Sequence, residues 1–199
     1  MSQFLFYLKQ GIGHIADLKG LDHMVFIVTL CAVFTWGQWR HILILVSAFT
    51  VGHTITLALS GLNIISINQQ LVETLIPVTI FLTSIYNITK GTVRNKHIQS
   101  NYFLALLFGL IHGMGFSNFF KAMMMGISDH SILLPLFSFN LGIEIGQFFI
   151  VSLFLIANFL LMSFFPIRHR DWNLVISGAG GGVAITMIVN ALIVSECIR

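Results

Sequence analysis

The sequence predicts an all-α fold, a polytopic membrane helix bundle of six spans. Of its 199 residues, 56% are hydrophobic and only 9% are charged, whereas soluble domains average about 25% charged residues. So few charged side chains cannot cover a protein of this size in water, and most of its surface must face lipid. The chain also contains long apolar runs, close to the roughly 20 residues that a spanning helix needs. Together these observations exclude a water-soluble globular enzyme.

Six apolar runs qualify as spans. The first, residues 21–36, is short, so we expect it to begin nearer Lys19 or to be completed by the segment before it. The fifth, residues 133–165, is too long for one perpendicular helix and implies a strong tilt, a projecting end or a break near Gly142 and Gly146. The other four are residues 41–60, 71–90, 101–120 and 173–198.

We expect a single integral membrane domain over residues 1–199. Residues 1–20 would form an interfacial or re-entrant segment, since residues 4–18 are half apolar and include Lys9, His14 and Asp17. Residues 21–198 would form the helix bundle. A seventh half-span near the start of the chain is the alternative for the N-terminal segment.

The Lys and Arg residues near the span ends predict the orientation. One side of the bundle would carry six of them, namely Arg40, Lys90, Arg94, Lys96, Arg168 and Arg170. The other side would carry four, namely Lys9, Lys19, Lys121 and Arg199. Because cytoplasmic loops are enriched in Lys and Arg, we expect a multi-pass cell-membrane protein with a cytoplasmic Lys90–Gln99 loop and both termini outside. These scattered charges form no basic run, and we expect no nucleic-acid partner.

Several ionisable side chains lie within the predicted spans, where each costs about 2.5 to 3.5 kcal/mol on insertion scales. They are Asp22, His23, His53, Glu73, His112 and Glu144, with His14 just before the first span. On the predicted topology all of them fall in the outer half of the bilayer, whereas independent hydrogen bonds would scatter over both halves. One shared polar pocket is the simpler account. We expect four side chains to converge there: His23, His53, His112 and Glu144.

The fifth span carries a polar stripe. Asn140, Glu144 and Gln147 stand at positions i, i+4 and i+7, which is one face of a helix. Three polar groups on one face of a helix in lipid need an interior to point into, and a structural hydrogen-bonded seam is the alternative. Gly142 and Gly146 lie off this stripe and could admit a neighbouring helix.

Imidazole and carboxylate groups without a thiolate suit divalent nickel, zinc, cobalt or copper, and we favour nickel or zinc. The candidate ligands are His14, Asp22, His23, His53, His112 and Glu144. The groups expected to hold these ligands in place are Glu73, Asn140 and Gln147. Asp22 and His23 are adjacent and point about 100° apart on a helix, so we expect His23 to bind the metal and Asp22 to hold another histidine.

Five segments that carry these polar residues stand in the order of the blocks of one known family. They are GIGHIADLKGLDHMVF, FTVGHTITLAL, LVETLIPVTIFLTSIYN, FGLIHGMGFS and FNLGIEIGQ. From about Gly11 to Gln147 the chain thus resembles the HupE/UreJ family of small membrane proteins. The resemblance implies a multi-spanning protein that handles nickel or a related divalent metal. It also implies that His14, Asp22, His23, His53, His112 and Glu144 occupy the family's characteristic positions. One departure is Ile15, where many members have proline.

We therefore predict a membrane protein that binds a divalent transition metal in a histidine and carboxylate pocket, for metal transport. The alternative is an intramembrane zinc-dependent hydrolase acting on lipid or lipidated substrate, which needs three ligands, an open coordination position and a general base. Its catalytic candidates are Glu144 or Asp22 as the base and Ser117 or Asn140 as the group that stabilises an oxyanion. A sensor or assembly factor is a third possibility.

The expected partners are the lipid bilayer and the metal ion. The transport hypothesis has one visible weakness, because the inner half of the bundle offers few polar groups that could pass an ion onward. The obvious ones are Ser47, Tyr86 and Asn87. Transport would therefore need a rearrangement that exposes the site inward, a partner subunit, or a homo-oligomer.

Overall fold

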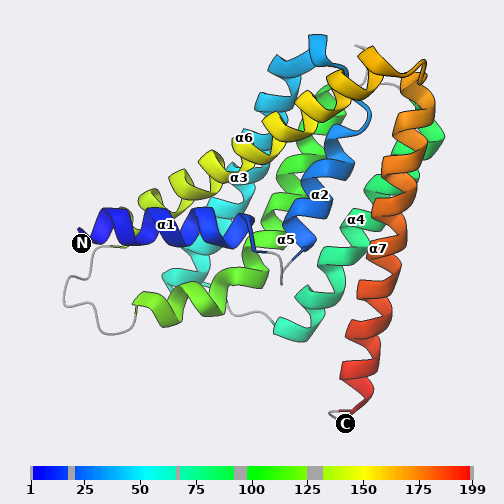
Figure 1. The fold of residues 1–199 in the computed structure, drawn as a ribbon. Coiled ribbons are helices and arrows are strands. Elements are labelled where there is room, and N and C mark those ends of the chain that lie inside the picture. Colours follow the sequence, from blue (N-terminus) through cyan, green and yellow to red (C-terminus); the bar gives the residue numbers. More distant parts are fainter. Residues whose placement is uncertain (1, 18–20, 66–67, 92–97, 125–131, 198–199) are drawn as a thin grey trace.

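Helices make up almost all of the chain that the structure describes. The computed structural model describes residues 2–17, 21–65, 68–91, 98–124 and 132–197. Its helices, shown in Figure 1, are α1 (Gln3–Ile15), α2 (Asp22–Cys31), the 3₁₀ helix η1 (Trp36–Gln38), α3 (Trp39–Gly61), α4 (Gln69–Lys90), α5 (Ile98–Met124), α6 (Leu133–Phe164) and α7 (His169–Cys197). These ranges contain no β-strand. The predicted all-α fold is confirmed.

Five helices, α3 to α7, are long and apolar enough to cross a membrane, which makes this a multi-pass membrane protein. The remaining predicted span, residues 21–36, differs from expectation, because α2 has only 10 residues. It is about 15 Å long, half of the roughly 30 Å hydrocarbon layer. The helix ends at Cys31, and the chain then turns at Thr35, whose N–H donates to Gln38 Oε1 at 3.1 Å.

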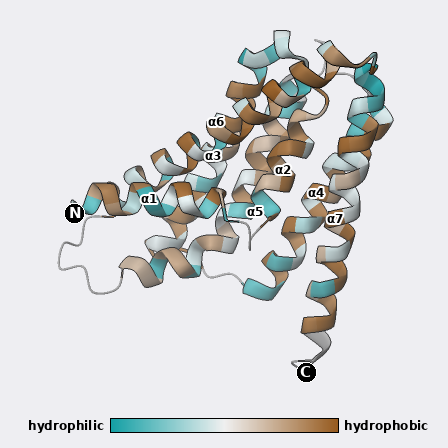
Figure 2. Cartoon of the chain, viewed as in Figure 1, coloured by the Kyte–Doolittle hydropathy of each residue, from teal (hydrophilic) through white to brown (hydrophobic). Residues whose placement is uncertain are grey.

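The long sixth helix is continuous through Gly142 and Gly146. Its 32 residues correspond to about 48 Å, more than the hydrocarbon layer is thick, and Figure 1 shows α6 running diagonally across the bundle. Of the arrangements expected from its length, the structure therefore has an unbroken, tilted helix. Figure 2 shows mainly apolar residues along α6 and hydrophilic residues at the start of α4 and at the turn from α6 to α7.

Three helix pairs build the bundle: α1 with α6, α3 with α5, and α4 with α7, while α2 packs against α4, α6 and α7. Glycines allow the close approach of α1 and α6. A Cβ atom on Gly11 would collide with the carbonyl oxygen of Phe139, and one on Gly142 would collide with that of Leu8. Gly142 thus admits a neighbouring helix, as expected, and that neighbour is α1. This contact fixes the last turn of α1, with His14, against the core of the bundle.

Candidate metal-binding site

Three histidines from three different helices meet inside the bundle. His14 lies in the last turn of α1, His23 near the start of α2, and His53 in the second half of α3. Each offers a ring nitrogen, and these three atoms all lie within 4.8 Å of one another. The ring centroids of His14 and His23 are 4.5 Å apart, and the His53 centroid is 6.0 and 6.1 Å from them. We call His14, His23 and His53 the histidine triad.

Asp22 orients the ring of His23. Its Oδ1 accepts hydrogen bonds from the backbone N–H of His23 at 2.8 Å and from His23 Nδ1 at 3.0 Å. Since a carboxylate only accepts, the proton of the ring is on Nδ1 and the lone pair is on Nε2. That Nε2 is buried and has no hydrogen-bond partner among the described residues. A carboxylate on one nitrogen and a free second nitrogen is the usual arrangement of a metal-binding histidine.

The expectation that Asp22 holds a different histidine is therefore wrong. Asp22 is the first residue of α2, where the next backbone N–H has no partner within the helix. The carboxylate turns back to accept that N–H, and this position also brings it to the ring of His23. The expectation used only the angle between neighbouring side chains on a helix. It did not include the bending of the Asp22 side chain back toward the backbone of α2.

The other members of the triad also carry nitrogens without partners. His14 Nε2 and at least one ring nitrogen of His53 are buried and unpaired among the described residues, and the Asn140 side chain lies beside the His53 ring. Leaving a buried polar group unpaired costs about 1 to 3 kcal/mol, and a bound metal would remove that cost. Burial, together with the nearby His23 and His53 rings, lowers the pKa of His14 well below its usual value. His14 is therefore neutral at pH 7, the form that binds metals.

His112 on α5 lies next to the triad. Its ring centroid is 5.1 Å from that of His23, and its Nε2 is 3.2 Å from Thr79 Oγ1. The Thr79 hydroxyl donates to the carbonyl oxygen of Ile76 at 2.7 Å, so it accepts the N–H of His112 Nε2. His112 Nδ1 then carries a lone pair, and it is also buried and unpaired. Sequence reasoning did not identify Thr79, which stands six residues after Glu73 on α4 and so on a different face of the helix.

A cavity of about 210 Å³ opens beside the histidines. Its polar lining includes three carboxylates, Asp17, Asp22 and Glu73. Glu73 was expected to hold a ligand in place, but it is exposed, and its carboxylate accepts a hydrogen bond from Gln69 Nε2 at 3.4 Å. Asp17 was not among the predicted site residues, and it lies beyond the end of α1 at Ile15, where helical spacing does not apply. The cavity is therefore acidic at its mouth and lined by the imidazoles of His14, His23 and His112 deeper in, with His53 behind these rings.

Glu144 lies in a different groove, between α3 and α6. Its Oε1 accepts a hydrogen bond from Ser47 Oγ at 2.7 Å, and Gln147 Oε1 accepts one from Thr50 Oγ1 at 2.7 Å. This groove of about 430 Å³ is also lined by Asn140. We call these five residues the α3–α6 seam.

The seam explains why Glu144 does not join the histidines. The polar face of α6 that carries Glu144 and Gln147 lies opposite a row of hydroxyl groups on α3. These hydroxyl groups donate hydrogen bonds to the Glu144 carboxylate and to the Gln147 amide oxygen. Glu144 is absent from the lining of the histidine cavity, so the expected convergence of Glu144 with the three buried histidines is not found. Within the stripe, Asn140 lies closest to the site, beside His53.

The residues expected to be catalytic in a hydrolase do not lie together in the structure. Ser117 is buried, and its hydroxyl donates to the carbonyl oxygen of Met114 at 2.7 Å. Neither Ser117 nor Glu144 lines the histidine cavity. Asp22 does line it, but the carboxylate is engaged with His23.

The fold and the site together define a class of protein, a multi-pass helical membrane protein with a buried histidine cluster that could hold a metal ion. The sequence model of the family described as HupE / UreJ protein matches residues 1–195. The chain therefore belongs to the HupE/UreJ family. This membership associates it with transport-related handling of metals such as nickel or cobalt at the membrane. None of the curated proteins and none of the solved structures matches the chain.

Proposed function

We propose that the histidine triad binds a divalent transition metal, nickel or zinc foremost, and that the protein carries this metal across the membrane. The observation that carries the proposal is the set of three ligand atoms within 4.8 Å, each on a ring with a buried, unpaired nitrogen. Metal–nitrogen bonds of about 2.0 to 2.1 Å correspond to about 3.4 Å between ligands of a tetrahedral ion. Small side-chain rotations would therefore close the triad on one ion.

The remaining residues of the cavity support capture of a hydrated cation. The carboxylates of Asp17, Asp22 and Glu73 line the mouth, where negative charge raises the local concentration of cations. An ion that moves inward exchanges water for imidazole, a ligand that suits zinc, nickel, copper and iron. His112, with its unpaired Nδ1, is available as a further ligand beside the triad.

We also propose that the histidine cavity opens to the outside of the cell. At the other end of the bundle, where η1 leads into α3 and α6 leads into α7, lie three tryptophans and several arginines: Trp36, Trp39, Trp172, Arg40, Arg168 and Arg170. Arginines near span ends favour the cytoplasmic side, and tryptophans favour the membrane interface. Lys90, the last residue of α4, begins the predicted cytoplasmic loop Lys90–Gln99, of which residues 92–97 lie outside the described part of the chain.

Uptake by reconstituted protein tests the transport proposal. Vesicles containing the purified protein and a trapped metal-sensitive dye would be mixed with nickel or zinc. Vesicles with the wild-type protein should take up the metal. The His23→Ala variant should lower the initial rate of metal uptake at least about tenfold, which corresponds to about 1.4 kcal/mol. His169→Ala is the matched control, since this histidine lies on α7 and contacts the carbonyl oxygen of Phe34 instead. Uptake no faster than in protein-free vesicles, or unchanged by His23→Ala, would contradict the proposal.

A further inference from the structure

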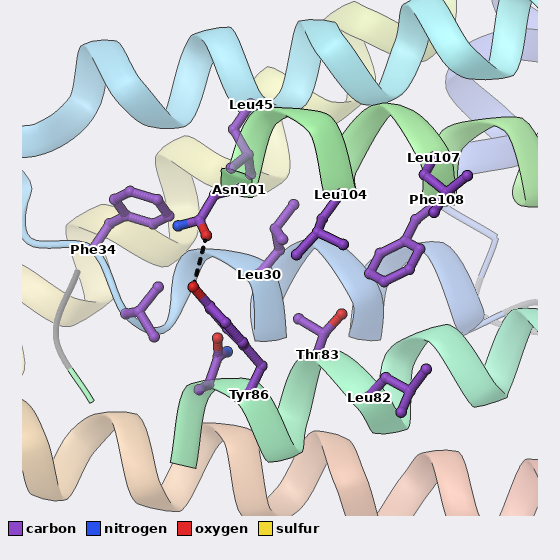
Figure 3. Close-up of a pocket in the computed structure, with 12 residues that line it drawn as sticks. Leu30, Phe34, Leu45, Leu82, Thr83, Tyr86, Asn101, Leu104, Leu107 and Phe108 are labelled. Atoms are coloured by element: carbon purple, nitrogen blue, oxygen red, sulfur yellow. Dashed lines mark hydrogen bonds between the residues drawn. The ribbon is translucent and has the colours of Figure 1, made fainter. Parts of the chain in front are cut away.

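A second cavity, of about 360 Å³, lies between α2, α3, α4 and α5. Figure 3 shows side chains of α4 and α5 pointing into it from facing helices. Its walls are largely leucine, but Thr83, Tyr86 and Asn101 also line it. Tyr86 donates a hydrogen bond to Asn101 Oδ1 at 3.2 Å. Thr83 and Asn101 are each 6% exposed, so they are buried polar groups in the wall of this cavity, which opens toward the surface at the exposed Leu82 and Leu107.

The register of the helices stacks this cavity beneath the histidines. On α3, Phe49 lies one turn before His53, and Leu45 lies two turns before it. On α5, the equivalent turn-by-turn series runs from His112 through Phe108 to Leu104, and on α2 from His23 through Phe26 to Leu30. The last residue of each series lines the second cavity. Seven or eight residues of helix, about 10 to 12 Å, therefore separate the two polar levels.

Three phenylalanines fill the level between the cavities. The ring centroid of Phe26 is 5.1 Å from that of Phe49 and 5.9 Å from that of Phe108. On the side of the triad, Phe26 and Phe49 pack against the ring of His112, at 4.9 and 5.2 Å. The three phenylalanines are 0%, 1% and 8% exposed. We call Phe26, Phe49 and Phe108 the phenylalanine layer.

We propose that the phenylalanine layer is the closed gate of the transport path and that the second cavity receives the divalent metal after it leaves the histidines. The inference rests on the proposed transport function. A layer of packed aromatic rings excludes water and so blocks a hydrated ion, and rotation of these rings would join the two cavities. Beyond the layer, the hydroxyl and amide oxygens of Thr83, Tyr86 and Asn101 are weaker ligands for these metals than imidazole, which favours onward release.

The first test enlarges one ring of the layer. Phe108→Trp should slow metal uptake into proteoliposomes at least about tenfold, equivalent to about 1.4 kcal/mol, while the Kd for nickel or zinc stays within about twofold. Phe103→Trp is the matched control on the same helix, because Phe103 is 66% exposed and faces away from the layer. Wild-type uptake by a Phe108→Trp protein that binds metal normally would overturn the gate and leave the transport function standing.

The second test measures access to the cavity with a smaller ring. Thr83→Cys would be exposed to a membrane-impermeant thiol reagent on the histidine side, alone and combined with Phe108→Leu. The gate predicts labelling at least about tenfold faster with Phe108→Leu, and equal labelling of both proteins would overturn it. Metal binding without uptake by wild-type protein would instead remove the transport function and the gate with it, so the two failures are distinguishable.

Discussion

Two groups of polar side chains lie inside the bundle, and they differ in how their hydrogen bonds are satisfied. In the α3–α6 seam, the Glu144 carboxylate and the Gln147 amide oxygen accept hydrogen bonds from Ser47 and Thr50, although Gln147 Nε2 and Asn140 Oδ1 have no partner among the described residues. In the histidine triad, by contrast, each ring carries at least one buried nitrogen without a partner among the described residues. The seam is thus joined by hydrogen bonds between two helices, whereas the three rings of the triad present buried nitrogens that a shared ligand would pair.

The comparison shows that the cost of burying a polar group can be offset in two ways within a membrane. Neighbouring hydroxyl groups offset it in the folded chain itself, and such hydrogen bonds are worth about 0.6 kcal/mol on average. A bound ligand can also offset the cost of burying a polar group, but the protein without its ligand is then less stable. Variants of the two groups should therefore affect different properties, metal affinity for the triad and helix packing for the seam.

The largest effect should follow from removing a triad ring. We expect His53→Ala to weaken metal binding at least about 100-fold, equivalent to about 2.7 kcal/mol, because one of three ligands is lost. Isothermal titration of the detergent-purified protein with nickel or zinc would measure it. His41→Ala is the control, since His41 is on the same helix and contacts the Tyr102 hydroxyl at 2.7 Å, away from the site. An unchanged affinity of His53→Ala would show that the metal does not bind at the triad.

A smaller effect should follow from changing the group that orients a ligand. Asp22→Asn keeps the shape of the side chain but removes the charge that fixes the proton on His23 Nδ1. Loss of such a partner typically weakens metal binding about 10- to 100-fold. Equilibrium dialysis against the metal would measure the change, and equal affinities for the variant and the wild type would mean that Asp22 serves only to cap α2.

The smallest effect on metal affinity should come from the seam. Ser47→Ala should lower the free energy of unfolding by about 0.6 kcal/mol, the average for a hydrogen bond between membrane helices, and leave the metal Kd within about twofold. Glu144→Gln should likewise keep the metal Kd. Denaturant unfolding in mixed micelles and metal titration would separate the two properties. A tenfold loss of affinity in Glu144→Gln would return this carboxylate to the metal site.

The sequence predicts the long helices well because their apolar runs are bounded by polar residues. The expected spans 41–60 and 71–90 correspond to α3 (Trp39–Gly61) and α4 (Gln69–Lys90). The end of α2 at Cys31 was not predictable in this way, because the residues that follow, up to Phe34, are as apolar as those before them. Hydropathy measures preference for lipid and not the continuity of a helix.

The candidate site was predictable in part for a similar reason. The cost of burying several ionisable groups predicts that they gather, and His14, His23 and His53 do lie together. The spacing of Asn140, Glu144 and Gln147 predicts a common face but does not reveal which helix lies opposite. A row of hydroxyl groups on α3, spaced as a helical stripe, is the signal that could have paired Glu144 with Ser47.

The metal coordination of the loaded protein tests the central claim most directly. X-ray absorption spectroscopy of the zinc-loaded, detergent-purified protein should show three imidazole nitrogens at about 2.0 to 2.1 Å, with the imidazole signal reduced in His14→Ala and in His53→Ala. Coordination by oxygen alone, or a spectrum that neither variant changes, would show that the metal binds elsewhere and would contradict the account.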